Sequence, residues 1–208
     1  LAWAGCSQGE LTQLSHQYFT TLLSMASLLA LVGGRAPAPG GFGFFAGAAT
    51  MTTSGRGVLA VLATFAALGR RWRAWPLFAV GVAVVPAACG AYLLWRGVFD
   101  AAIQDVFVWT AHRYAGIQAV PYGAGATAED LPLVLAYPLA VLALVALLVR
   151  RDAETQRRLL PPLVFAVCGL VGPLPRPDHW HMTVTAPLIL PLLALAWDRF
   201  APSAARLR

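Results

Sequence analysis

The chain has 208 residues, of which 59% are hydrophobic and only 12% are charged. A soluble domain carries about a quarter charged residues, so this composition excludes an ordinary soluble domain and predicts a membrane protein. The fifteen basic residues are all arginine, and the net charge is +6. Because arginine concentrates in the cytoplasmic loops of membrane proteins, we interpret this charge as a topology signal and expect no nucleic-acid partner.

Apolar segments follow one another along the chain, separated by turns rich in Pro, Gly or Arg. A helix rises about 1.5 Å per residue, so about twenty apolar residues cross a bilayer. We predict an all-α polytopic membrane helix bundle with about six transmembrane or partly spanning helices plus an interfacial helix. The predicted helices cover residues 18–34, 42–51, 58–69, 74–95, 131–149, 159–174 and 180–197.

The two apolar segments within 42–69 are each shorter than a usual span, and the sequence TTSGRG divides them at 52–57. They could form one long helix with a polar middle, or two short helices that meet at a polar turn. We expect two short helices, because pairs of short, interrupted segments often bracket sites in membrane proteins. The Pro/Gly segment 35–41 is predicted to be a turn, and 150–158 a charged loop.

Residues 96–130 form a long polar stretch, which we expect to be an external loop. Within it, residues 99–116 have the pattern of a helix that lies on the membrane surface, with Trp109 and Tyr114 at the level of the headgroups. The Gly-rich segment 122–130 has no phosphate-loop pattern, so we interpret it as a flexible segment that could act as a lid.

Charge divides the predicted loops into two sides. If residues 70–73 face the cytoplasm, eleven of the fifteen arginines fall on that side, as the positive-inside rule requires. All four histidines and six of the nine acidic residues fall on the opposite side. The groups that chemistry would use are therefore expected on the extracytoplasmic face. The all-arginine, Ala- and Gly-rich composition hints at a GC-rich bacterium, and we expect an integral protein of the bacterial inner membrane.

The segment LPRPDHWHMTVTAPLILP, 174–191, places polar side chains between two apolar runs. Arg176 can bind a phosphate or a carboxylate through its forked donors, and Asp178 can accept a proton. His181 can donate to an anion or titrate near neutrality. The alternative is a loop whose polar residues are merely hydrated. Because an idle polar group in an apolar run costs a few kcal/mol, we expect Asp178 and His181 to belong to a substrate region.

Three further candidates lie elsewhere in the chain. Arg56 is the single charge between the two short apolar segments, so it binds an anion or extends to the lipid headgroups. His112 and Arg113 either grip a lipid phosphate or belong to a purely structural interfacial helix. Histidines two residues apart are a weak metal signal, so we predict no metal ligands, and a divalent cation is the one cofactor that the sequence leaves open.

The stretch FFAGAATMTTSGRGVLAVLATFAALGRRWRAWP, the later HRYA and the late RPDHWHMTVTAPLILPLLAL carry a family resemblance. Over residues 15–198 the chain resembles GT-C-type integral membrane glycosyltransferases, such as protein mannosyltransferases and aminoarabinose transferases. The resemblance implies transfer of a sugar from a polyprenyl-phosphate-type lipid carrier to a lipid, glycan or protein acceptor on the extracytoplasmic face. It also implies that Arg56, Arg113 and Arg176 bind phosphate, while Asp178 and His181 line the pocket.

The catalytic carboxylate of that family lies in a first external loop, after a helix that this sequence does not show. We therefore expect residues 1–208 to form a single transmembrane domain that is a piece of a longer polytopic enzyme surrounded by membrane lipids, with the catalytic acid upstream. A relative without catalysis is the alternative. The competing function classes are a transporter or lipid flippase, to which broken helices are also suited, and a structural membrane subunit.

Overall fold

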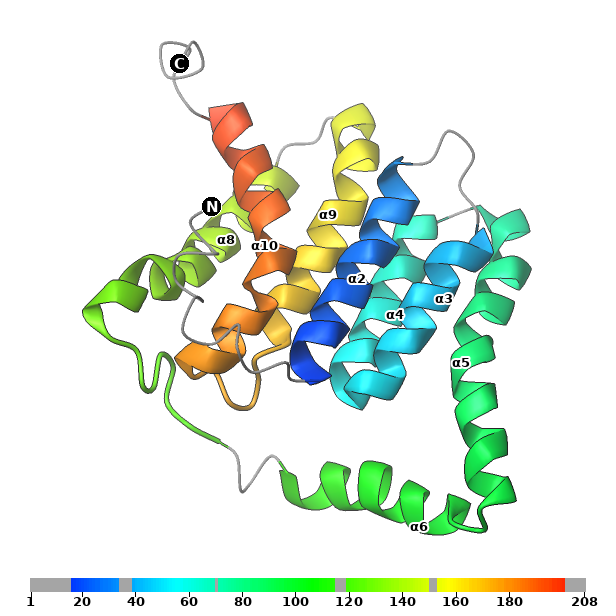
Figure 1. Ribbon diagram of the computed structural model, residues 1–208. Coiled ribbons are helices and arrows are strands. Elements are labelled where there is room, and N and C mark those ends of the chain that lie inside the picture. Colours follow the sequence, from blue (N-terminus) through cyan, green and yellow to red (C-terminus); the bar gives the residue numbers. More distant parts are fainter. Residues whose placement is uncertain (1–15, 34–38, 70, 115–118, 150–152, 201–208) are drawn as a thin grey trace.

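The computed structural model describes residues 16–33, 39–69, 71–114, 119–149 and 153–200 (Figure 1). These residues are helical apart from short turns and loops, and there is no strand among them. Three helical segments are long and apolar enough to cross a membrane: Trp72–Trp95, Ala128–Val149 and His179–Phe200. The prediction of an all-α fold is confirmed, and the predicted number of spans, about six, stays a prediction.

The main helices in chain order are α2 (His16–Gly33), α3 (Pro39–Thr52), α4 (Ser54–Leu68), α5 (Trp75–Trp95), α8 (Leu131–Val149), α9 (Ala153–Val171) and α10 (His179–Phe200). Shorter elements connect them: η1 (Trp72–Ala74), α6 (Phe99–Ile103), η2 (Gln104–Tyr114) and η3 (Ala128–Asp130). In Figure 1, α2, α3, α4, α9 and α10 form the middle of the bundle, with α5 on one flank and α8 on the other.

The region 42–69 forms two short helices, as we expected, with a break at Thr53, whose backbone is extended. Three predicted helix starts were several residues too late. Helix α4 begins at Ser54 and not at residue 58. Helix α3 already begins at Pro39, because proline is well tolerated in the first turn of a helix. Helix α9 begins at Ala153, inside the predicted charged loop 150–158.

Close packing of glycines joins α5 to α3. A Cβ atom on Gly47 of α3 would overlap the backbone of Val82 in α5, and one on Gly81 of α5 would overlap the carbonyl of Gly40. Small residues of this kind let helix backbones approach closely in membranes, where apolar lipid gives helices little hydrophobic reason to associate. Gly57 plays the same part between α4 and α3, since a Cβ there would overlap the backbone of Thr50.

Two apolar clusters fill the bundle. One joins α8, α9 and α10 around Tyr137, Met182 and Ile189. The other joins α2, α3, α4, α5, α9 and α10 around Phe42, Phe78 and Phe165. Helices α9 and α10 contribute to both clusters, so they tie α8 to the rest of the bundle.

The two ends of the bundle differ in what they contain. One end, lower in Figure 1, collects the starts of α2 and α10, the α3–α4 turn and the end of α9. The opposite end holds η1 and the last turn of α10, which contain the described arginines Arg73 and Arg199. The other arginines predicted for that side, apart from Arg71 beside η1, belong to residues or side chains outside the described part of the chain.

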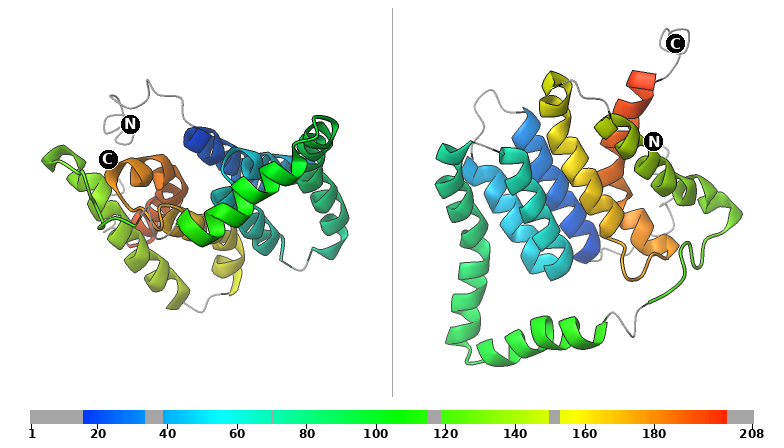
Figure 2. Two further views of the ribbon diagram at one scale, coloured as in Figure 1. Left: turned by 90° about the horizontal axis from the view of Figure 1, so that it is seen from below. Right: turned by 180° about the vertical axis from the view of Figure 1, so that it is seen from behind.

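Helix α6 and η2 run across the lower end of the bundle in Figure 1 and in the right view of Figure 2, and the left view of Figure 2, from below, shows them in front of the other helices. This placement agrees with the predicted helix at 99–116. Within it, residues Gln104–Tyr114 form a wider π-helix. A π-helix bonds each N–H to the carbonyl five residues earlier, so the spacing of an α-helix does not apply.

Candidate functional site

Asp178 stands directly before α10 and holds polar residues on both sides of it, Arg176 before the helix and His181 in its first turn. Its Oδ1 accepts a hydrogen bond from the backbone N–H of His181 at 2.9 Å and lies 2.7 Å from the Nδ1 atom of the same residue. Its Oδ2 accepts a hydrogen bond from Nε of Arg176 at 2.6 Å. The carboxylate thus caps the first turn of α10 and holds two predicted site residues in place.

The same contacts keep Asp178 ionised. Burial raises the pKa of this carboxyl, which is 8% exposed. The hydrogen bonds from the backbone and ring of His181 and from Arg176 lower it by more, so that the pKa lies below its ordinary value. Asp178 is therefore a poor proton acceptor and a good fixed negative charge.

Arg56 lies in the first turn of α4 and points back into the bundle. Its Nε donates to the carbonyl of Gly172 at 2.8 Å, and its Nη1 donates to Oε1 of Gln17 at 3.2 Å. The buried Gly57 permits this position, because it lets α4 lie directly against the backbone of α3. Both predicted roles of Arg56, anion binding and extension to the lipid headgroups, stay predictions.

Gln17 completes the network, and the sequence analysis missed it. Its Nε2 lies 3.4 Å from Nε2 of His181, while its Oε1 accepts from Arg56. A continuous chain of contacts therefore runs from Gly172 through Arg56, Gln17 and His181 to the Asp178 carboxylate. One signal was present: Gln17 is a polar residue at the start of an apolar helix, on the predicted side of the histidines.

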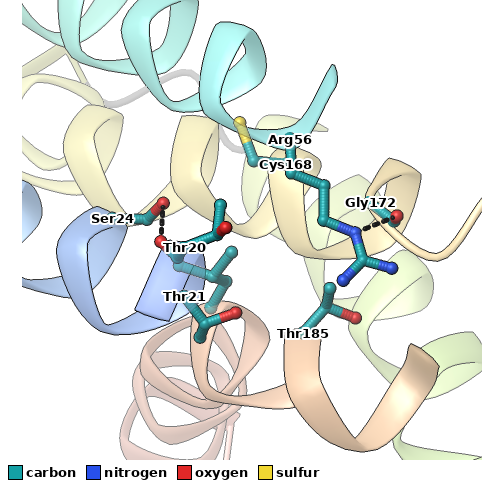
Figure 3. Close-up of a pocket in the computed structure, with 8 residues that line it drawn as sticks. Thr20, Thr21, Ser24, Arg56, Cys168, Gly172 and Thr185 are labelled. Carbon is teal, nitrogen blue, oxygen red and sulfur yellow. Dashed lines mark hydrogen bonds between the residues drawn. The ribbon is translucent and has the colours of Figure 1, made fainter. Parts of the chain in front are cut away.

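A small cavity lies beside this network (Figure 3). Its lining residues are Thr20, Thr21, Ser24, Arg56, Cys168, Gly172, Thr185 and Leu188. Among the predicted site residues, Arg56 lines it, whereas Asp178 and His181 do not. The hydroxyl groups around it bond within the protein: Thr21 donates to the carbonyl of Val184, and Ser24 donates to that of Thr20. The expectation that Asp178 and His181 line a substrate pocket stays a prediction; in the structure they connect to Arg56 through Gln17.

The Gly-rich segment that we interpreted as a flexible lid is fixed to the site by its backbone. The N–H of Gly123 donates to the carbonyl of Pro177 at 2.8 Å, and the N–H of His179 donates to the carbonyl of Ala124 at 3.1 Å. Gly125 has a φ angle of +76°, which a residue with a side chain rarely adopts. This segment therefore forms a wall against Pro177 and His179, the residues on either side of Asp178.

His112 lies apart from the site. It belongs to η2, its side chain is exposed, and its Nδ1 atom lies 2.8 Å from the carbonyl of Val108. Together with Gln104, Asp105, Val108 and Trp109 it lines a shallow groove on that helix. The side chain of Arg113 lies outside the described part of the chain. Among the described candidates, the fold thus brings together Arg56, Arg176, Asp178 and His181 and leaves His112 outside.

The described residues offer no set of metal ligands, since no three His, Cys, Asp or Glu side chains among them come together. What they offer is a pair of guanidinium groups, an oriented imidazole and a fixed carboxylate. No protein-family model matches the sequence, and no curated protein or solved structure matches it. The chemistry of the site therefore has to be argued from its own geometry.

Proposed function

We propose that the chain is a segment of a membrane glycosyltransferase that takes a sugar from a polyprenyl-phosphate-type lipid carrier on the extracytoplasmic face. The observation that carries the proposal is that Arg56 and Arg176 enter one hydrogen-bonded network from two separate parts of the chain. Guanidinium groups bind phosphate through paired donors, and a charge held among apolar helices is a functional group by default.

The position of the network suits such a carrier. It lies where α2, α4 and α10 begin and α9 ends, and α10 is long and apolar enough to cross a membrane. At that level the phosphate of a lipid carrier meets arginine, while its hydrocarbon chain stays among apolar helix surfaces. Helices α5 and α8 offer such surfaces, with exposed side chains that include Leu77, Val80 and Leu142.

A transporter or lipid flippase is the second candidate, and the prolines inside the long helices favour it. Pro86, Pro138 and Pro187 each remove a backbone hydrogen bond within a helix, which eases the bending that alternating access requires. A flippase for a phosphate-bearing lipid would use the same arginines. The two candidates therefore differ in the fate of the sugar and not in the ligand chemistry.

The test uses membranes that contain the protein expressed from its complete reading frame. Radiolabelled sugar is offered on a panel of polyprenyl-phosphate donors, and transfer to lipid, glycan and protein fractions is measured. Arg56→Gln and Arg176→Gln should each raise the KM for the donor about tenfold to a hundredfold, because a charged hydrogen bond contributes about 1.5–3 kcal/mol. Arg96→Gln is the matched control, since Arg96 is exposed and lies beside Trp95 at the end of α5.

The outcomes separate the candidates. Transfer that weakens in both arginine variants and persists in the control supports the glycosyltransferase. Movement of the intact lipid between leaflets without transfer supports the flippase. Transfer that neither arginine variant alters contradicts the assignment of the phosphate site.

A further inference from the structure

The hydrogen bonds through Gln17 can run in one direction only. A guanidinium group has donors and no acceptor, so the Gln17 atom that faces Arg56 must be the amide oxygen. The amide NH₂ group therefore faces Nε2 of His181. That nitrogen must then accept, and the ring proton sits on Nδ1, where it donates to Asp178.

Each alternative proton arrangement brings two hydrogen-bond donors, or two acceptors, face to face. Turning the Gln17 amide would place its NH₂ group against the donor of Arg56. Moving the ring proton of His181 to Nε2 would place two donors face to face at Gln17, and would bring the bare Nδ1 atom against a carboxylate oxygen at 2.7 Å. One proton arrangement therefore satisfies all three contacts. It presents the lone pair of Nε2 toward Gln17 and Arg56.

We propose that His181 is the proton acceptor for a hydroxyl group of the acceptor substrate, that Asp178 positions its ring, and that the Gln17 amide occupies the place of that hydroxyl in the ligand-free protein. A hydroxyl presents to Nε2 the same kind of donor as the amide does. The inference rests on the proposed function and identifies the acceptor as a hydroxyl compound. It differs from the first-loop carboxylate that the family resemblance implies.

In the proposed step, one bond forms for each bond that breaks. The O–H bond of the acceptor breaks and its proton passes to Nε2 of His181, while the oxygen forms a bond to the anomeric carbon of the sugar. The bond from that carbon to the carrier phosphate oxygen breaks, and the phosphate leaves with the electron pair. Arg56 neutralises the charge that develops on the phosphate, and Asp178 stabilises the imidazolium.

The charges around His181 favour this order of events. Asp178 bonds to its ring, Arg176 shares that carboxylate, and Arg56 approaches from α4. From α8, the hydroxyl of Tyr137 donates to the carbonyl of Met182, the next residue. Two arginines oppose a positive charge on the ring, and a bound phosphate would cancel that opposition. The imidazole would thus become a better base once the donor is in place.

Two measurements test the proposal. In protein with ¹⁵N-labelled histidine, the His181 signal, assigned by its loss in His181→Gln, should show protonation at Nδ1 above neutral pH. In the transfer assay, His181→Gln should lower kcat about a hundredfold or more and leave the KM for the donor within about threefold. Asp178→Asn should shift the acidic limb of the pH profile to lower pH, because the imidazolium loses its carboxylate. His16→Gln is the control, since His16 is exposed at the start of α2.

The readouts keep this proposal apart from the proposed function. A ring protonated at Nε2 overturns the inference whatever the protein does. If the wild-type protein transfers sugar and a folded His181→Gln variant keeps the full kcat, the inference is overturned and the glycosyltransferase proposal stands. Absence of transfer with every donor, by inserted wild-type protein, overturns both.

Discussion

Replacing Gly47 with alanine tests how α5 is attached to the bundle. Gly47 of α3 faces the backbone of Val82 in α5, and an added Cβ would lie 2.8 Å from both Cα and the carbonyl carbon of Val82. Ordinary contact begins at 3.4 Å. The helices would therefore have to separate by at least about 0.6 Å, the difference between these distances, and by more to clear the Val82 carbonyl oxygen, which lies nearer still; backbone cannot rotate away as a side chain can.

The cost follows from that separation. A gap of 0.5–1 Å forfeits about a quarter to a half of the dispersion energy of each contact across the interface. Overpacking of this kind costs about 1–3 kcal/mol, against which alanine regains up to about 1 kcal/mol of helix propensity. We expect Gly47→Ala to lower the free energy of unfolding by about 1–2 kcal/mol.

The measurement is reversible unfolding of the purified protein in mixed micelles of rising denaturing-detergent content. Gly55→Ala is the matched control, because it makes the same change in α4 where a Cβ meets nothing within 4 Å. This control should be neutral or slightly stabilising. If Gly47→Ala proved as stable as Gly55→Ala, the close contact between α3 and α5 would not be what holds α5.

Three further predictions concern the site and its surroundings. The stability that wild type has over Asp178→Asn should persist from neutrality down to about pH 4 and be lost in stronger acid, because a lowered pKa means that the charge stabilises the fold above the unfolded-state pKa. Unfolding at a series of pH values checks this prediction. Tyr137→Phe should lower the free energy of unfolding by about 0.5–1.5 kcal/mol in the same assay, because the buried hydroxyl bonds to the Met182 carbonyl. An unchanged free energy of unfolding would show that this hydrogen bond contributes nothing. Gly125→Ala should speed hydrogen exchange at the amides of Gly123 and His179. The φ angle of +76° strains a residue with a side chain, and the added Cβ would lie 3.1 Å from Nδ1 of His179. Unchanged exchange would contradict this strain.

The sequence predicted the helices where local and global signals agree. Long apolar runs fixed the place of α5, α8 and α10, and the polar break near Thr53 predicted the α3–α4 pair. The prediction of helix starts failed where a residue that suggests a turn or a loop also belongs to a helix. We placed Pro39 inside a predicted turn, whereas it begins α3, since proline also starts helices. We predicted a loop for the residues after Asp152 because they are charged, although they are strong helix formers and belong to α9.

The site was predicted in part, for a related reason. Arg56 and His181 stood out because each is a polar residue among apolar ones. Gln17 did not, because an uncharged residue at a helix start needs no explanation from sequence alone. Its role depends on the α2–α10 contact and on the direction in which Arg56 points, both of which are tertiary. The widening of η2 into a π-helix had no recognisable sequence signal either.

The wall that the Gly-rich segment forms beside the site has a consequence for variation. Its two attachments, Gly123 to Pro177 and His179 to Ala124, join main chain to main chain. Such bonds ask nothing of the side chains, apart from the positive φ angles that Gly123 and Gly125 supply. The path of residues 123–125 therefore depends on main-chain bonds, whereas Tyr122, Thr127 and Asp130 of the same segment bond through their side chains.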